Sequence, residues 1–158
     1  MATWCFNTVT FTGEPDMLNE LTEYFYEMAR LDEHPRTGRL PYFATIRRGW
    51  MYNFGWSGKF YFYATKSKPN TAVLIEIADR YGLDFLHEYE EMVGRIYGVA
   101  TYERGELRLT EVDPEDFDEY SYNENTNTYE FENEHFDSCD EILQILLERK
   151  QNIQDLTI

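Results

Sequence analysis

Basic residues are absent from positions 109–148, although the chain has 14 Lys and Arg against 30 Asp and Glu. This stretch holds 14 of the acids, so the rest of the chain, with 16 acids and all 14 bases, is close to neutral. Segregated charge of this kind bears on partners and solubility rather than on fold. The sequence therefore predicts a nearly neutral body followed by an acidic segment.

Cysteine is also scarce, because the chain of 158 residues has only Cys5 and Cys139. A small secreted protein held together by disulfides carries more cysteines at regular spacing. The N-terminus lacks the basic and apolar regions of a signal peptide, and no apolar run approaches the ~20 residues of a membrane helix. We therefore expect a cytoplasmic protein with two reduced thiols and no membrane segment.

Recognisable catalytic and metal-binding motifs are missing as well. His87 has no second histidine four residues away, so a zinc-protease motif is excluded and a structural role is favoured. One short cluster offers four kinds of metal ligand: Glu134, His135, Asp137 and Cys139. Such clusters are common where acids are dense, and no G-x-S-x-G or glycine-rich phosphate loop occurs. We predict no catalytic residue, no metal site and no cofactor.

Aromatic residues, in contrast, are abundant at 17% of the chain, with 13 Tyr and 11 Phe. Disordered chains are poor in aromatics, and a chain of this length can bury roughly two-thirds of its unfolded surface. We expect a single compact domain.

The order of the predicted elements indicates the fold. Alternating apolar residues predict strands over 3–12, 50–56, 59–66 and 83–89, and helical spacing predicts helices from Pro15 and after Asn70. A further hairpin follows over 95–102 and 106–112. Strand, helix, strand, strand, helix, strand is the order of the split βαβ, or ferredoxin-like, fold. The predicted class is therefore α+β, an antiparallel sheet with two helices on one face plus an added hairpin and a C-terminal strand and helix.

The acidic segment is predicted to be ordered. Tyr129 and Phe131 alternate with glutamates over a predicted strand at 128–136, and a capping-box pattern at 138–141 starts a terminal helix. We predict a body at 1–112 and an acidic extension at 113–158 packed on it. The apolar stripe of the terminal helix packs on the chain's own sheet or, alternatively, on a second copy in a homodimer.

The strand at 59–66 is unusually aromatic. Phe60 and Phe62 share one face of it, and Tyr61 and Tyr63 share the other. Some ferredoxin-like sheets stack RNA bases on such residues, but nucleic-acid binding draws on a basic surface that this body lacks. We interpret the strand as a core face with a Tyr-rich outer face, and keep a nucleic-acid-binding aromatic sheet as a second alternative.

Several local patterns carry a family resemblance. Trp4-Cys5-x-Asn7 opens the first strand, the run 78–82 leads into an acidic-aromatic strand, and the run 96–105 forms the added hairpin. With the element order, these patterns resemble the YubB-like ferredoxin-fold proteins of plasmids, phages and integrated elements. The resemblance covers about residues 1–112 and implies an accessory factor of mobile DNA, without a known activity.

The acidic segment is the best functional lead. Carboxylates interleaved with aromatics indicate an ordered negative surface, which complements basic proteins and steers their approach. We therefore predict a non-enzymatic protein that docks a basic partner, such as a nucleic-acid-binding host protein, and acts as a DNA-mimic inhibitor of restriction or CRISPR defence. The predicted contact residues are Glu115, Asp116, Asp118, Glu119, Tyr120, Tyr122, Glu124, Glu130, Glu132 and Glu134.

A small enzyme or anion-binding protein is the first alternative. It would use the longest loop of the body, residues 32–48, whose arginines could hold an anionic substrate. These arginines are Arg36, Arg39, Arg47 and Arg48.

Overall fold

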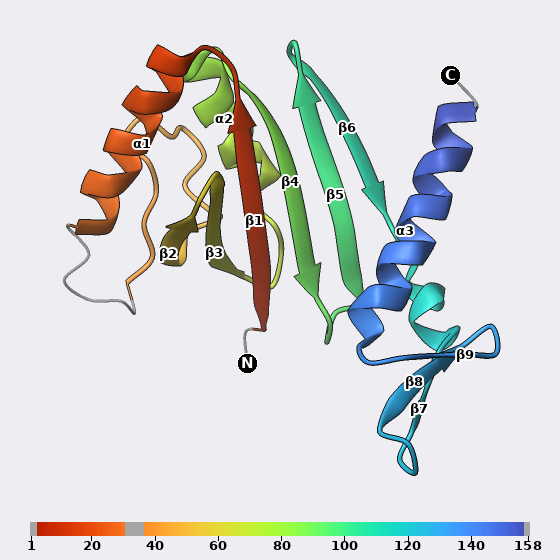
Figure 1. Ribbon diagram of the computed structural model, residues 1–158. Coiled ribbons are helices and arrows are strands. Elements are labelled where there is room, and N and C mark those ends of the chain that lie inside the picture. Colours follow the sequence, from red (N-terminus) through yellow and green to blue (C-terminus); the bar gives the residue numbers. More distant parts are fainter. Residues whose placement is uncertain (1–2, 31–36, 157–158) are drawn as a thin grey trace.

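The computed structural model describes residues 3–30 and 37–156 (Figure 1). The main sheet has six antiparallel strands in the order β2-β3-β1-β4-β5-β6. Its elements are β1 (Trp4–Thr12), α1 (Pro15–Arg30), β2 (Tyr52–Ser57), β3 (Phe60–Lys66), α2 (Thr71–Tyr81), β4 (Asp84–Glu91), β5 (Ile96–Glu103) and β6 (Glu106–Glu111). The first four strands have the ferredoxin-like order, and β5 and β6 extend that sheet beyond β4. The predicted fold class is confirmed.

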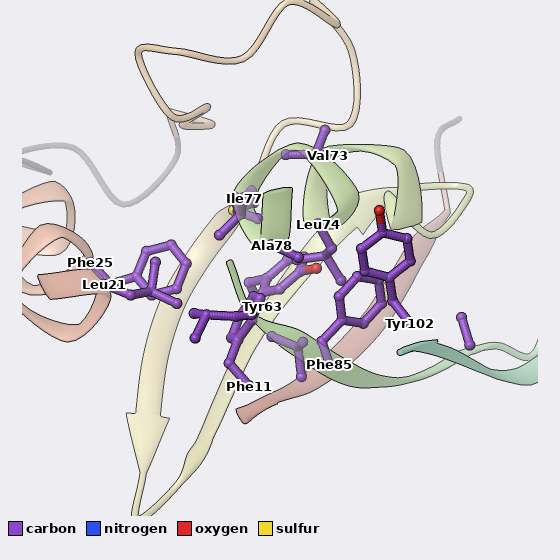
Figure 2. Close-up of a cluster of buried hydrophobic side chains, with 14 of the residues drawn as sticks. Phe11, Leu21, Phe25, Tyr63, Val73, Leu74, Ile77, Ala78, Phe85 and Tyr102 are labelled. Atoms are coloured by element: carbon purple, nitrogen blue, oxygen red, sulfur yellow. The ribbon is translucent and has the colours of Figure 1, made fainter. Parts of the chain in front are cut away.

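The core lies between the sheet and the two helices α1 and α2, which cover one face of it (Figure 2). Val9 and Phe11 of β1 point into this layer, where they meet Phe25 of α1 and Ile77 of α2. Burying side chains of this size is the main favourable term in folding. The odd-numbered face of β1 is therefore the core face.

Helix α2 has a glycine cap at its C-terminus but no side-chain cap at its N-terminus. Gly82 ends the helix in the left-handed conformation at φ 65°, which glycine adopts without steric cost. Asn70 precedes the helix, but its side chain does not cap it. Its Oδ1 instead accepts a hydrogen bond from the Tyr63 hydroxyl at 2.5 Å, and its Nδ2 donates to the Gly49 carbonyl at 3.0 Å. The asparagine therefore joins α2 to the sheet and the preceding loop.

The faces of β3 are the reverse of those expected from the sequence. Tyr61 and Tyr63 pack toward the helices, whereas Phe60 and Phe62 are 50% and 44% exposed. Tyrosines fit the core here because their hydroxyls find partners: Tyr61 with Thr22 at 2.7 Å, and Tyr63 with Asn70. The predicted Tyr-rich outer face is wrong, and the outer face of β3 carries phenylalanine.

A long helix, α3 (Cys139–Leu156), crosses the opposite face of the sheet over β5 and β6. Leu143 and Leu147 pack there against Val99 and Val112. The terminal helix thus covers part of the chain's own sheet. Within the described ranges, no helix is long and apolar enough to cross a membrane.

The acidic segment forms a small structure of its own, next to the start of α3 (Figure 1). It consists of η1 (Pro114–Asp118) and a three-stranded sheet of β7 (Ser121–Asn123), β8 (Thr128–Phe131) and β9 (Glu134–Phe136). The single strand predicted over 128–136 is wrong. Glu132 and Asn133 have φ of 49° and 64°, so the chain turns back there as a tight hairpin.

The β2 edge of the main sheet is irregular. Tyr52 pairs with Ala64 and Gly55 with Phe62, so β2 has one residue more than β3 between these pairs. Asn53, inside this bulge, has a φ of 54°. A bulge of this kind bends the strand and interrupts its ladder.

Candidate functional site

The acidic subdomain, residues 113–136, is fastened to the rest of the chain by three ion pairs. Arg95, in the turn between β4 and β5, donates to the two carboxylate oxygens of Asp118 at 2.8 and 3.1 Å. From α3, Lys150 reaches Asp113 at 2.9 Å, and Arg149 holds Glu132 with two hydrogen bonds of 2.7 and 2.8 Å. The subdomain is therefore an attached surface and not a free tail.

These contacts also favour the ionised carboxylates. Hydrogen bonds and the positive charge of Arg95 lower the pKa of Asp118, and Arg149 lowers the pKa of Glu132 in the same way. All four side chains are more than 40% exposed, so salt will screen these pairs. The pairs orient the subdomain and add little to overall stability.

Aromatic side chains form the inner layer of the subdomain. Phe131 is 6% exposed, and the ring of Tyr129 contacts both Tyr120 and Tyr122 with centroids 5.9 and 5.0 Å apart. Tyr120 also packs against the cluster beneath α3, where burial raises its pKa to about 12. Within β8, alternation sets Tyr129 and Phe131 on one face of the small sheet and Glu130 on the other.

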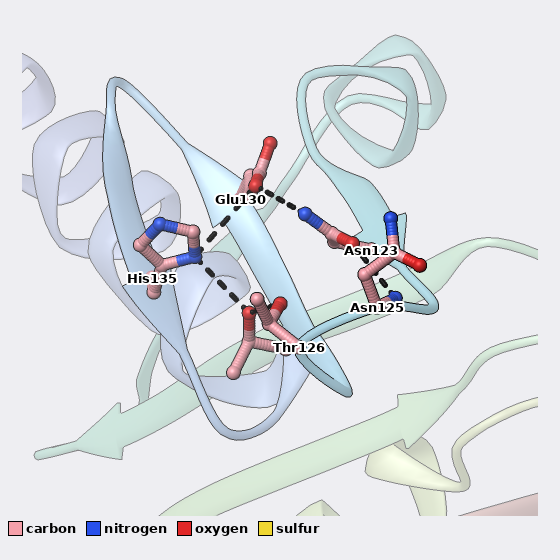
Figure 3. A network of polar contacts seen from close by, with 6 residues as sticks. Asn123, Asn125, Thr126, Glu130 and His135 are labelled. Atoms are coloured by element: carbon pink, nitrogen blue, oxygen red, sulfur yellow. Dashed lines mark hydrogen bonds and ion pairs between the residues drawn. The ribbon is translucent and has the colours of Figure 1, made fainter.

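A shallow hollow opens on this small sheet, with a volume of about 380 Å³. Glu130 lies at its wall, where it accepts a hydrogen bond from Asn123 at 2.9 Å (Figure 3). The Nδ1 atom of His135 lies 3.7 Å from Glu130 and 3.1 Å from the Thr128 hydroxyl. The other lining residues are Glu119, Phe131, Glu132 and Asn133. The hollow is therefore rich in carboxylates.

The ten predicted contact residues all lie on this subdomain but differ in their surroundings. Asp118 and Glu132 are occupied by arginines, Asp116 accepts a hydrogen bond from the Asp113 backbone, and Tyr120 is half-buried. Four carboxylates are exposed and, among the described residues, form no ion pair: Glu115, Glu119, Glu124 and Glu134. With Tyr122, which is 50% exposed, these four are the exposed predicted contacts that no arginine or lysine of the described residues pairs with.

The arginines of the 32–48 loop have separate surroundings. Arg36 lies outside the described residues. Arg39 is half-buried and its backbone pairs with that of Met51, while the guanidinium of Arg47 lies 5.2 Å from the centre of the Trp50 ring. Arg48 is exposed. An anion site at this loop stays a prediction.

His87 is enclosed in the core beneath α2. Its Nε2 lies 2.8 Å from Asn7 Oδ1 and its Nδ1 lies 3.1 Å from the Thr71 hydroxyl. Burial lowers the pKa of His87 to about 3, so the ring is neutral at physiological pH. The two cysteines are free thiols, and the described residues contain no group of three or more His, Cys, Asp and Glu suited to a metal ion.

Sequence reasoning missed one surface, the face of the main sheet that α1 and α2 leave uncovered. It carries exposed apolar side chains from three strands, here called the open aromatic face: Trp4, Phe6, Phe60, Phe62 and Leu86. Between this face and α3 runs a cleft of about 410 Å³, whose walls include Phe6, Glu88, Glu90 and Leu147. Alternation along β1 and β3 signalled two faces, but the position of α3 could not be derived from it.

Comparison with known proteins gives one match. The family model described as the ferredoxin-like domain in Api92-like protein matches residues 49–132. The match begins just before β2 and ends after β8, so it includes most of the acidic subdomain. No curated protein and no solved structure matches the chain.

Proposed function

The chain belongs to the family of the ferredoxin-like domain in Api92-like protein, and we propose that it is a non-enzymatic binding protein whose acidic subdomain docks a basic protein. Glu115, Glu119, Glu124 and Glu134 are the proposed charged contacts, and the exposed Tyr122 is the proposed aromatic contact. We also propose a cytoplasmic setting, because two free thiols suit a reducing compartment.

The observation that carries this proposal is the way the subdomain already binds an arginine. Arg149 donates two hydrogen bonds to Glu132, and its guanidinium lies 5.5 Å from the centre of the Phe131 ring. A carboxylate beside an aromatic ring is a favourable site for a planar guanidinium. Glu115, Glu119, Glu124 and Glu134 are exposed carboxylates that no Lys or Arg of the described residues pairs with, so each is open to an arginine of a partner in the way that Glu132 binds Arg149.

The attachment of the subdomain supports the same proposal. A surface held by Arg95, Arg149 and Lys150 is ordered before binding, so docking costs less conformational entropy than it would for a flexible tail. A net charge of −16 attracts basic proteins at long range and speeds their encounter.

The identity of the partner is a finer proposal. The resemblance to YubB-like proteins of mobile elements suggests a basic host protein of restriction or CRISPR defence, which the acidic surface would occupy as a DNA mimic. Such a partner would release the protein when duplex DNA is added in excess. Binding that duplex DNA does not compete with would contradict mimicry and leave protein docking intact.

The decisive experiment is a titration of the protein with purified basic nucleic-acid-binding proteins at two salt concentrations. We expect affinity to fall as salt rises, because exposed charge contacts are screened. The site variant changes Glu115, Glu119, Glu124 and Glu134 to Gln, and we expect it to lose about tenfold or more in affinity.

A matched control removes the same amount of charge elsewhere. It changes Glu14, Glu20, Glu23 and Glu106, all exposed on the main body, to Gln. Equal losses in both variants would mean that net charge alone drives binding. Absent or salt-insensitive binding would refute the proposal.

A further inference from the structure

The open aromatic face is too large to be a scatter of single surface residues. Its five members are 39–60% exposed, and Phe6 is the most exposed of them at 60%. Burying their exposed parts would remove on the order of 400 Å² of surface, from typical areas of large side chains. An apolar surface of that size on a water-soluble domain usually marks a place where another molecule binds.

The strand register places the phenylalanines of two strands side by side. Thr8 of β1 pairs with Phe62 of β3, so Phe6, two residues earlier in β1, lies diagonally beside Phe62. Thr10 pairs with Phe60 in the same way. The apolar side chains of this face therefore lie along the two central strands, where a ligand can contact several of them at once.

Helix α3 forms a wall along one side of this face (Figure 1). It packs over β5 and β6, next to β4, through Leu143 and Leu147. The cleft of about 410 Å³ lies at the foot of the wall, between Leu147 of α3 and Phe6 and Leu86 of the sheet. The open aromatic face and α3 thus make a trough, with β3, β1 and β4 as its floor.

The width of the trough fits a single helix. Four strands, β2, β3, β1 and β4, lie beside α3 and span about 19 Å at about 4.8 Å per strand. A helix with its side chains is about 10–12 Å across, and neighbouring helices pack about 8–10 Å apart. A helix docked against α3 would therefore lie over β4 and β1, whereas a second sheet laid on this face would collide with α3.

Acidic groups line the side of the trough next to α3. Glu88 and Glu90 of β4 lie in the walls of the cleft, and Glu148 of α3 accepts a hydrogen bond at 3.1 Å from Gln144, which lines the same cleft. Among the described residues, none of these three carboxylates pairs with a lysine or an arginine. Burial and the negative charge of Asp140 raise the pKa of Glu90. A cation that entered the cleft would offset this repulsion.

The opposite side of the trough carries a positive charge. Lys66 of β3 is exposed, and its Nζ lies 5.3 Å from the centre of the Tyr52 ring. Lys66 pairs with Trp4, so it marks the β3 side of the face. Because Lys66 would repel a cation, the basic groups of a ligand belong on the side toward α3. The charges of the trough therefore set both the sign of the ligand and its orientation.

A nucleic acid suits the trough less well. Bases stack on aromatic side chains of such sheets, but phosphates need nearby cations. Here Glu88 and Glu90 would repel the phosphates, and the protein as a whole carries a charge of −16.

We propose that the open aromatic face binds an amphipathic helix of a partner protein, whose apolar side packs on the phenylalanines and whose lysines or arginines on one flank pair with Glu88 and Glu90. Along residues 4–10 of β1 the floor is about 20 Å long, which a helix of about 13 residues covers. The trough lies on the main sheet and not on the acidic subdomain, so this inference does not rest on the function proposed above.

A synthetic peptide tests the proposal with the full chain. It has about 14 residues, leucine and lysine only, spaced so that the leucines form one stripe of a helix. In calorimetric titrations at about 0.15 M salt, where exposed charges are partly screened, we expect one binding site in the micromolar range. A peptide of the same composition in an order that gives no apolar stripe should bind about tenfold more weakly or less.

A pair of matched variants locates the apolar contact. Phe6→Thr should weaken binding of the striped peptide by about tenfold or more, because interface aromatics carry much of the binding energy. Leu109→Thr is the control and should bind like the unchanged protein, since Leu109 is 49% exposed on the opposite face of the same sheet. Circular dichroism verifies that both variants fold.

A second pair of variants tests the charged contact. Changing Glu88 and Glu90 together to Gln should weaken binding by about threefold to tenfold, because two ion pairs are lost. The control changes Glu20 and Glu23 to Gln, which removes the same charge from the exposed side of α1. Equal losses in the two double variants would show that net charge and not the trough attracts the peptide, and would contradict the proposal.

Three further outcomes would overturn it. The first is equal affinity for the striped and the unstriped peptide, and the second is a Phe6→Thr variant that binds as tightly as Leu109→Thr. The third is binding that the four-glutamate variant of the acidic subdomain abolishes while Phe6→Thr preserves it, which would assign the peptide to that subdomain. Tight binding of single-stranded oligonucleotides that Phe6→Thr abolishes would assign the open aromatic face to nucleic acid instead.

Discussion

The Nε2 atom of His87 lies 2.8 Å from the side-chain oxygen of Asn7, inside the core and between neighbouring strands. The asparagine in turn donates to the Thr65 hydroxyl at 3.0 Å and to the Cys5 carbonyl at 3.1 Å. This buried polar chain links β4, β1 and β3. It explains why a histidine that is 0% exposed is tolerated under α2.

The buried histidine predicts a loss of stability in acid. Its folded pKa of about 3 is below the usual 6.5, so the unfolded state gains a proton first as pH falls. The free energy of unfolding should therefore drop by about 1.4 kcal/mol per pH unit between 6.5 and 3, in addition to any carboxylate effect. Urea unfolding at several pH values measures this slope, and His87→Gln should reduce it. The same slope in His87→Gln and in the exposed control His135→Gln would contradict this assignment.

The ion pairs of the acidic subdomain predict a local effect. Arg149→Gln removes both hydrogen bonds to Glu132, so the hairpin of β8 and β9 should open more often while the main sheet is unaffected. Hydrogen exchange should show faster exchange at residues 128–136. Arg48→Gln, in an exposed loop of the body, is the control, and slow exchange in both variants would show that Arg149 does not fasten the hairpin.

The packing of α3 predicts a strong position dependence along one helix. Leu143 is fully buried against β5 and Leu147, so Leu143→Ala should cost about 2–5 kcal/mol in unfolding free energy. Ile153, in the same helix, is 62% exposed, and its change to Ala should cost less than about 0.5 kcal/mol. Denaturant titration of both variants compares them, and equal costs would mean that α3 is not packed as described.

Replacing either of two glycines by alanine should destabilise the protein, but for different physical reasons. A Cβ at Gly98 would lie 2.8 Å from the Thr110 backbone oxygen and 2.5 Å from Glu111, so Gly98→Ala should destabilise by about 1–3 kcal/mol through overpacking. Gly58 has open space around it but a φ of 60°, so Gly58→Ala should cost about 1–2 kcal/mol from backbone strain alone. Combining Gly98→Ala with Glu111→Ala should recover part of the first loss and none of the second.

The order of elements could be predicted because each rests on local patterns. Alternation predicted β1 and β4, Pro15 predicted the start of α1, and helical spacing after Asn70 predicted α2. The positive φ values of Arg104 and Gly105 likewise belong to the turn of the hairpin predicted over 95–102 and 106–112. Each of these signals depends only on residues close together in the chain. The order in which the predicted strands and helices follow one another gives the ferredoxin-like fold.

The sequence did not predict which side chains are buried where their burial depends on segments far away in the chain. Period-two alternation separates Phe60 from Tyr61 but does not say which face the helices cover. The hydroxyl partners Thr22 and Asn70, which let the tyrosines point inward, come from other elements. The same limit applies to the acidic subdomain, where Glu132 and Asn133 adopt a turn inside a run that alternates like one strand.

The bulge in β2 has a consequence for self-association. An exposed edge strand with a regular ladder is a template to which further chains can add without end, as in amyloid fibrils. The extra residue between Tyr52 and Gly55 breaks the regular spacing of the donors and acceptors along that edge. Growth by strand addition is thereby discouraged at β2, so this aromatic-rich chain can keep an apolar surface in water without seeding aggregation from that side.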